Sequence, residues 1–335
     1  MGRTGRTCAQ PHPIRRRAAM TVVAALDIGG TKTAAALVDA GGRLLHRRTV
    51  PTPAAAGPAA VLDAAAGAVT ELAAAGGPYA AVGVGSAGVI DAAAGTVLSA
   101  TAALPGWAGT ALRAGLGRRL GVPAAVDNDV HAHALGETWR GAAAGRGHVL
   151  LVAAGTGVGG SLVLGGRVHR GARSAAGHVG HVPVPAAAGR PCACGGTGHA
   201  EGVASGPAMA AEYHRRTRAP AGDGPASVTG PASVTGLAAV AERAAAGDAV
   251  AVAVLEEGAR ALGEAVGGLV NVLDPELVLV TGGVSRCGPV WWRPLRAAIA
   301  ATTLPPLSDV PVVPGALGDD AALLGAARLA LEAIA

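Results

Sequence analysis

The chain has 335 residues, enough for two domains, carries a formal net charge of +5, and is 50% hydrophobic. Residues 1–19 contain five arginines and no acidic residue, so the rest of the chain is neutral and does not indicate a nucleic-acid-binding surface. Gly, Pro or charged residues interrupt every apolar stretch before about 18 residues, which argues against a membrane-spanning helix.

Residues 1–20 are predicted to form a disordered basic tail. Arg15-Arg16-Arg17 and the apolar residues after them faintly resemble a twin-arginine export signal. Cleavage there would remove the apolar run 21–26, which leads into the first glycine loop. We therefore prefer either a disordered extension or a chain whose true first residue is Met20.

Residues 21–50 are predicted to form three strands, and a glycine-rich loop at 27–33 joins the first two. The same order of apolar run, glycine-hydroxyl loop and apolar run recurs at 148–164. Gly lets backbone N–H groups approach an anion closely, and Thr adds a hydroxyl donor. One such hairpin is more often a tight turn. Two of them, together with a third glycine turn at 280–284, favour loops that hold the phosphates of one nucleotide between them.

Lys32 is the only lysine in the chain, whose other basic residues are arginines and histidines. A compact, flexible ammonium in such a loop favours a phosphate contact, and chance placement is the alternative. The loop residues expected at the nucleotide are Gly29, Gly30, Thr31, Lys32, Thr33, Gly155, Thr156, Gly157, Gly159, Gly282 and Gly283.

Helical and strand patterns alternate along the rest of the chain. Further strands are predicted at 80–86, 124–126 and 277–281, and helices at 58–76, 112–120, 130–140, 237–246, 248–272 and 320–334. Residues 171–200 are expected to be irregular, and the direct repeat at 225–236 is expected to be a surface loop without function. This alternation predicts an α/β fold.

From Met20 onward the chain resembles the ROK family of sugar kinases, which have a two-domain actin-like (hexokinase-like, ribonuclease H-like) ATPase fold with the active-site cleft between the domains. A DNA-binding module of the kind found in the family's repressors would not fit within the roughly twenty residues before the first strand. The resemblance rests on Asp27-Ile-Gly-Gly-Thr-Lys-Thr33, Asn128-Asp129, Gly155-Thr-Gly-Val-Gly-Gly160, Gly177-His-Val-Gly-His181, Cys192-x-Cys194-Gly-x-x-Gly-His199-x-Glu201, Gly282-Gly-Val284 and Leu317-Gly-x-x-Ala-x-Leu-x-Gly-Ala-Ala327.

The resemblance implies an N-terminal domain at 21–127, completed by the C-terminal helix within 316–335, and a second domain at 128–315. It also implies phosphorylation of the 6-hydroxyl of a hexose or N-acylhexosamine by ATP and Mg²⁺, with Asp27 acting through Mg²⁺ or its waters. The implied assembly is a homodimer. Polyphosphate-using relatives exist, and nothing in the sequence decides between that donor and ATP.

The cysteines indicate a cytoplasmic chain with a metal site, because Cys192 and Cys194 are too close in sequence for an unstrained mutual disulfide. With His181 and His199 they supply four N and S ligands, a structural Zn²⁺ set in the loop 178–201. The family pattern has Cys where this chain has His199. The alternative is that His199 points elsewhere and leaves three ligands.

Asp129 is the catalytic base that the resemblance implies. Without the resemblance, an Asp between a strand and a helix is better interpreted as an N-cap. Asn128 would hold a neighbouring sugar hydroxyl. The sugar contacts implied by the resemblance are Gly88, Thr101, Asn128, Asp129, His178, His181 and Glu201.

Many family members have Glu at the position of His178. The Gly-His-x-Gly-His form found here at 177–181 resembles that of bacterial N-acetylmannosamine kinases. A neutral imidazole offers a donor and an acceptor, whereas a carboxylate only accepts. Either His178 selects a different sugar or it merely supports the zinc loop, so N-acetylmannosamine and glucose both stay open. The alternative functions are a non-catalytic sugar-binding regulator and an assembly ATPase of the same fold.

Overall fold

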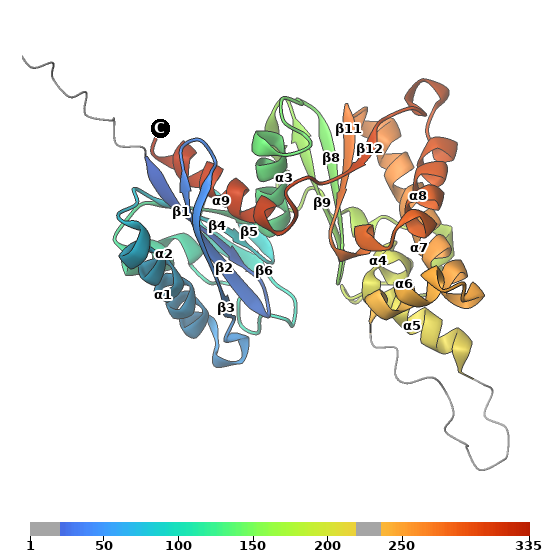
Figure 1. Ribbon diagram of the computed structural model, residues 1–335, viewed down its shortest axis with the longest axis horizontal. Helices are drawn as coiled ribbons and strands as arrows, with labels where there is room; N and C mark the ends of the chain where they lie inside the picture. Colours follow the sequence, from blue (N-terminus) through green and yellow to red (C-terminus); the bar gives the residue numbers. More distant parts are fainter. Residues whose placement is uncertain (1–20, 219–235) are drawn as a thin grey trace, which may run out of the picture.

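The computed structural model describes residues 21–218 and 236–335, so the predicted tail and nearly all of the predicted repeat loop lie outside the described residues. The chain forms two α/β halves, each built on a five-stranded sheet (Figure 1). The first sheet has the order β3-β2-β1-β4-β7 and the second the order β10-β9-β8-β11-β12. In each sheet an antiparallel meander is followed by two parallel strands. The repeated sequence pattern therefore corresponds to a repeated architecture.

The first sheet consists of β1 (Val22–Ile28), β2 (Lys32–Asp39), β3 (Leu44–Pro51), β4 (Val82–Ser86) and β7 (Ala124–Asn128). The second consists of β8 (Val149–Ala154), β9 (Val158–Leu164), β10 (Arg167–His169), β11 (Leu277–Thr281) and β12 (Val312–Pro314). A small hairpin pairs β5 (Val89–Asp91) with β6 (Thr96–Ser99). The helices are α1 (Pro58–Gly76), α2 (Leu112–Leu120), α3 (Asp129–Arg140), α4 (Glu201–Ala204), α5 (Gly206–Thr217), α6 (Leu237–Ala245), α7 (Ala249–Leu273), α8 (Pro289–Thr302) and α9 (Ala321–Ala333).

Alternating residues of the first strand in each half face two different helical layers. In β1, Leu26 packs with α1 and α2, whereas Val23 packs with α9. In β8, Leu150 packs with α7 and α8, whereas Leu151 packs with α3. Because successive strand residues point to opposite faces, these nearly continuous apolar runs bury both faces of each sheet.

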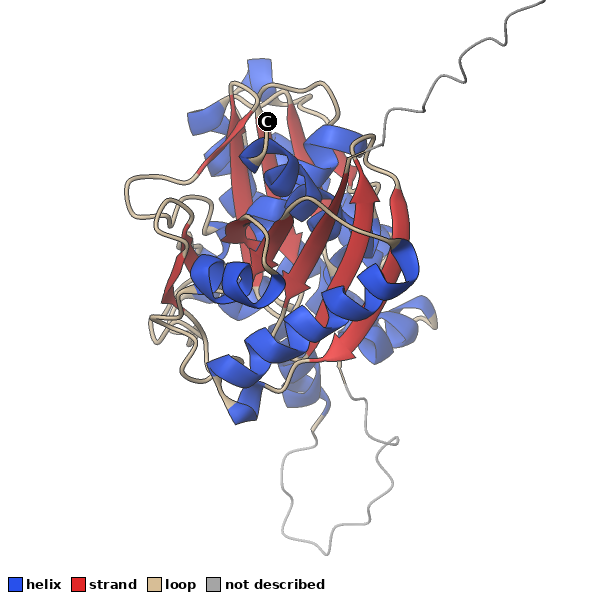
Figure 2. Ribbon diagram, turned by 90° about the vertical axis from the view of Figure 1, so that its left-hand side faces the viewer, coloured by secondary structure: helices blue, strands red, loops and turns tan. Residues whose placement is uncertain are grey.

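Helix α1 is long and apolar enough in composition to cross a membrane. Here its apolar residues recur every three or four positions, and Val61, Ala65, Val69 and Leu72 are buried against the first sheet. Figure 2 shows helices lying across the strands on this side of the molecule. The helix is therefore part of the core of the first half.

Helices α3 and α9 lie side by side between the two sheets (Figure 1). Their backbones touch where Gly136 meets Gly325. A Cβ added at Gly325 would overlap the carbonyl oxygen of Ala132, and one added at Gly136 would overlap that of Ala321. We propose that the expected domain boundary at 127/128 falls at this central layer, because α3 begins there and packs on the second sheet.

We expect Gly325→Ala to destabilise the protein by about 1–3 kcal/mol or more, because both helix backbones would have to separate. Gly268→Ala is the matched control, since this exposed glycine of α7 has open space around its added Cβ. It should stabilise the helix by about 0.5–1 kcal/mol. Urea unfolding of both variants checks the prediction, and equal stabilities would contradict the close packing of α3 on α9.

Candidate active site

Asn128 and Asp129 lie where β7 ends and α3 begins, at the carboxyl edge of the first sheet. Asn128 is the N-cap, because its Oδ1 accepts hydrogen bonds from the backbone N–H groups of Val130 and His131 at 2.9 and 3.1 Å. Its Nδ2 donates to the carbonyl oxygen of Gly88 at 2.9 Å and to Oδ1 of Asp129 at 2.8 Å. The capping role that the sequence offered for Asp129 therefore belongs to Asn128.

Among the described residues, hydrogen-bond donors reach one carboxylate oxygen of Asp129. Oδ1 accepts from Nδ2 of Asn128 and from the backbone N–H of Val130, whereas no described residue donates to Oδ2. Asp129 is partly exposed, and desolvation raises the pKa of its carboxyl group. An oriented carboxylate with one free oxygen and a raised pKa is suited to accept a proton.

Two other predicted sugar contacts lie near this pair or on an adjoining loop. Gly88 has a φ of 108°, and a Cβ there would meet the carbonyl oxygen of Ser99, so the position requires glycine. Thr101 is exposed on the loop after β6, which packs on Gly30 through Ala103. No hydrogen bond joins the Thr101 side chain to another described site residue.

Asp27, at the end of β1, faces the same region. Its pKa is raised from 3.8 to about 7, chiefly by burial and also by the charges of Asp129 and Asp319, against the opposing charges of Lys32 and Arg47. Such a carboxylate is available to a bound cation or its waters, because a positive charge would favour the ionised form. The predicted link between Asp27 and Mg²⁺ thus fits its surroundings.

We expect Asp27→Asn to stabilise the folded protein above pH 7. A carboxyl group whose pKa is raised on folding binds its proton more tightly when folded, so ionisation costs stability as the pH rises from 3.8 to about 7. At about 1.4 kcal/mol per pKa unit, the cost approaches about 4 kcal/mol. Denaturant unfolding should show the gain at pH 8 and not near pH 4. The exposed Asp309→Asn is the control, and a loss of stability at pH 8 would contradict the prediction.

Two adjoining cavities run from this region into the second half. The smaller has a volume of about 650 Å³, and Asp27, Lys32, Thr281 and Gly282 contribute to its lining. The larger, about 1330 Å³, is mainly apolar and is bounded by α5, α6 and the start of α8. Gly283 lines both. The shape suits a ligand with an anionic end in the smaller cavity and an apolar end in the larger.

The predicted phosphate loops occupy different places around these cavities. In the first loop, Gly29 N–H donates to the carbonyl oxygen of Lys32 and Thr31 is exposed, whereas Thr33 is buried with its hydroxyl 2.8 Å from that of Thr52. The buried hydroxyl of Thr33 therefore stabilises the loop through its hydrogen bond with Thr52.

In the second half, Gly155 and Thr156 line the larger cavity. Gly157 lies against Glu201, and Gly159 belongs to β9. Gly282 has a φ of 91°, and a Cβ added there would overlap the carbonyl oxygen of Ala154, so the turn after β11 passes close to the end of β8.

The four predicted metal ligands come together. Sγ of Cys192 lies 3.6 Å from Nδ1 of His181, and Sγ of Cys194 lies 3.3 Å from Nδ1 of His199. All four ligand atoms lie within 4.8 Å of one another. Ligands of a tetrahedral Zn²⁺ are separated by roughly 3.5 Å, so this set fits one ion and His199 points into it.

The remaining predicted sugar contacts adjoin this cluster. The rings of His178 and His181 stack with centroids 5.9 Å apart. Oε2 of Glu201 accepts from the backbone N–H of Val158 at 2.8 Å, and Oε1 accepts from the Cys192 thiol at 3.4 Å. Glu201 therefore connects the metal cluster to the second glycine loop.

Several residues around the smaller cavity were not predicted as site residues, among them His133, Arg286 and Asp319. His133 lies one helical turn after Asp129, and its Nε2 is 3.1 Å from Oγ1 of Thr281. Asp319 lies 3.9 Å from the Lys32 ammonium and 3.5 Å from the Arg286 guanidinium, so it joins the two halves. The i, i+4 spacing from Asp129 was the available signal for His133.

The comparisons with known proteins agree with this architecture. The sequence profile of the ROK family matches residues 23–333. The chain belongs to the ROK family. It is 34% identical to a glucokinase of Streptomyces coelicolor over 320 residues, which cover 93% of this chain and 98% of that protein.

Two solved structures of ROK proteins extend the similarity to three dimensions. The ROK hexokinase from Thermus thermophilus is 33% identical, with a TM-score of 0.79 and coverage of 94% of this chain and 99% of that one. A ROK family glucokinase from Streptomyces griseus, solved in complex with glucose and AMPPNP, is 33% identical with a TM-score of 0.77, covering 93% and 99%. The actin-like, hexokinase-like α/β fold predicted from the sequence is confirmed.

Proposed function

We propose that this protein transfers the γ-phosphoryl group of ATP to the 6-hydroxyl of a hexose or N-acylhexosamine. The observation that carries the proposal is Asp129: Asn128 and the start of α3 fix one of its oxygens, the other is free, and its charge acts on Asp27 in the adjoining cavity. The names of the ROK glucokinase and hexokinase relatives support a sugar as acceptor.

The proposed reaction assigns each part of the site a task. Oδ2 of Asp129 accepts the proton of the sugar hydroxyl while the hydroxyl oxygen bonds to the γ-phosphorus. The bond between the γ-phosphorus and the oxygen that bridges it to the β-phosphate breaks, and ADP leaves. The larger cavity holds the nucleoside, and Lys32 and Arg286 lie beside the phosphates. Asp27 would hold Mg²⁺ or its waters, and the ion supplies charge neutralisation on the phosphates.

The sugar candidates remain glucose and N-acetylmannosamine. Nδ1 of His178 is 2.9 Å from the carbonyl oxygen of Ala175, so in the neutral ring Nδ1 donates and Nε2 is an acceptor. An accepting Nε2 offers a sugar hydroxyl the same hydrogen bond as the carboxylate of many family members. This role is compatible with glucose, the sugar bound in the Streptomyces griseus glucokinase.

We also propose that His181, Cys192, Cys194 and His199 hold a structural Zn²⁺. The loop 178–201 contains two short 3-10 turns and two isolated β-bridges, Pro183–His199 and Pro191–Thr197, but no helix or strand before α4 begins at Glu201. A closed four-ligand site would fix His181 and Glu201 in place without exposing the ion to substrate.

Coupled ADP release with ATP and Mg²⁺, across glucose, N-acetylmannosamine, N-acetylglucosamine, mannose and fructose, tests the proposed function. We expect turnover with glucose or N-acetylmannosamine and little ADP release without sugar. A parallel series, with polyphosphate in place of ATP and sugar phosphate as the readout, tests the donor. Sugar binding without any phosphorylation would favour the regulator, and sugar-independent ATPase activity would favour an assembly ATPase.

A further inference from the structure

Asp127 lies directly before Asn128 and Asp129, and its side chain is fully buried. Oδ1 accepts from the backbone N–H of Asn128 at 2.8 Å and from Nδ1 of His131 at 2.9 Å. Oδ2 accepts from Nε and Nη2 of Arg170 at 2.9 and 2.5 Å. Burial alone would raise the pKa of Asp127, but the hydrogen bonds and charges of His131 and Arg170 hold it below its usual value.

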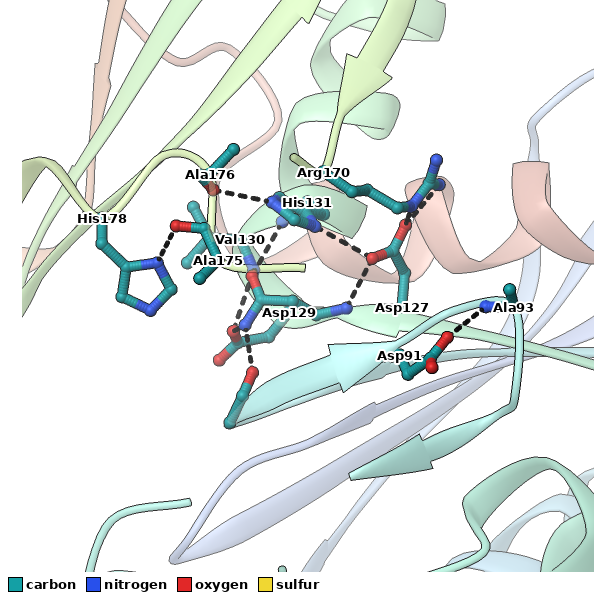
Figure 3. Close-up of polar contacts among 12 residues, drawn as sticks. Asp91, Ala93, Asp127, Asp129, Val130, His131, Arg170, Ala175, Ala176 and His178 are labelled. Carbon is teal, nitrogen blue, oxygen red and sulfur yellow. Dashed lines mark hydrogen bonds and ion pairs between the residues drawn. The ribbon is translucent and has the colours of Figure 1, made fainter. Parts of the chain in front are cut away.

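These contacts connect the two halves beside the proposed sugar site. Asp127 ends β7 of the first sheet, whereas Arg170 directly follows β10 of the second. His131, on α3, contacts Asp127 through Nδ1, and its Nε2 is 3.3 Å from the carbonyl oxygen of Ala176 (Figure 3). One buried carboxylate thus contacts two side chains that reach the segment leading to His178.

The segment 170–178 has no helix or strand of its own. The backbone N–H of Ala176 donates to the carbonyl oxygen of Arg170 at 3.1 Å, and Ala175 accepts from Nδ1 of His178 at 2.9 Å. Ser174 adopts a φ of 55°, which is unfavourable for a residue with a side chain. External hydrogen bonds are therefore needed to keep this turn in one conformation.

We propose that Asp127, His131 and Arg170 form a positioning network that fixes the turn carrying His178 against Asn128 and Asp129, and so sets the affinity for the sugar. The inference rests on the proposed function and assigns positioning residues for it. None of the three lines the two cavities described above, so the affinity for ATP should not depend on them. A network that only stabilised the fold would affect the affinities for sugar and ATP alike.

Arg170→Leu removes both guanidinium hydrogen bonds to Asp127 and is the main test. We expect the KM for sugar to rise about 10- to 100-fold, as for the loss of charge-assisted hydrogen bonds, while the KM for ATP at saturating sugar changes less than about twofold. Arg170→Lys restores a cation and should recover part of the sugar affinity. Arg173→Leu is the matched control, because Arg173 is exposed on the same segment and has no hydrogen bond to a described residue.

A second route is needed should Arg170→Leu fail to fold. In His131→Asn, the side-chain amide on α3 can still donate a hydrogen bond to the Asp127 carboxylate, but it is too short to reach the carbonyl oxygen of Ala176. It should raise the KM for sugar with the melting temperature nearly unchanged. If the network acts through the His178 turn, adding Arg170→Leu to His178→Ala should raise that KM much less than Arg170→Leu does alone.

The outcomes separate this inference from the proposed function. Wild-type turnover with an unchanged sugar KM in Arg170→Leu and His131→Asn would overturn the network alone. Equal rises in the KM values for sugar and ATP would also overturn it. If the wild type binds sugar without turnover, the kinase proposal fails, and calorimetric sugar affinities of the same variants decide the network. If it binds no sugar, both proposals fail.

Discussion

We expect Asp129→Asn to lower kcat for sugar phosphorylation by about 10²–10⁴-fold, the usual contribution of a positioned general base. The variant keeps the size and the Oδ1 of the side chain, so the hydrogen bonds from Asn128 and Val130 to that oxygen are retained. It replaces the free Oδ2 by an amide that cannot accept the hydroxyl proton. The chemistry is lost, whereas the geometry of the α3 N-terminus stays the same.

Kinetics and binding measurements together check this result. ATP affinity by calorimetry should differ less than about twofold from the wild type, because Asp129 does not line either cavity that we assign to the nucleotide. Asp309→Asn, an exposed acid-to-amide change, is the control and should leave kcat intact. Full activity in Asp129→Asn would remove this residue from the mechanism.

Loss of the metal cluster has the second large effect. His199→Asn or removal of zinc by a chelator should lower turnover about 100-fold or more and reduce the melting temperature, since structural zinc sites contribute folding energy outright. The affected loop carries His181, whose ring stacks on His178, and ends at Glu201. Sugar binding should therefore suffer more than nucleotide binding.

Two variants make the zinc prediction specific. His199→Cys restores the ligand common in the family and should keep about one zinc per chain together with activity. His46→Asn changes an exposed histidine remote from the cluster and should alter neither. Metal analysis by mass spectrometry reads out all variants. A metal-free wild type with full activity would contradict the structural role.

Much of the architecture could be predicted because both halves follow simple patterns. The helices expected at 58–76 and 112–120 have those bounds in the structure, and the two glycine loops do join antiparallel strands. Helix α8 was missed because it begins with Pro289 and contains Pro294, which breaks an interior hydrogen bond. Its Trp291, Leu295 and Ile299 are buried at a spacing of four residues, the signal that could have revealed it.

The α5 helix and the β5–β6 hairpin were missed for different local reasons. Helix α5 begins with Gly206-Pro207, a pair that usually marks a loop, and here Ser205 caps it by accepting from the backbone N–H of Ala208. Strands β5 and β6 contain only three and four residues, too few for an alternating pattern.

Site residues that belong to a family motif could be predicted from the sequence. Contacts between segments far apart in the sequence could not. Asn128 and Asp129 follow from the family resemblance. The contact between Asp127 and Arg170 joins residues 43 positions apart, and local periodicity holds no information on such pairs. Asp319 was not expected as a site residue, because its closeness to Lys32 and Arg286 depends on how the two halves pack.

Identification of the product tests the central claim most directly. Wild-type protein is incubated with ATP, Mg²⁺ and ¹³C-labelled glucose or N-acetylmannosamine, and the product is analysed by NMR. The account predicts a phosphorus coupling at C6 of the sugar, absent with Asp129→Asn. Phosphate on another carbon would contradict the assigned hydroxyl, and release of inorganic phosphate without a sugar phosphate would contradict the kinase itself.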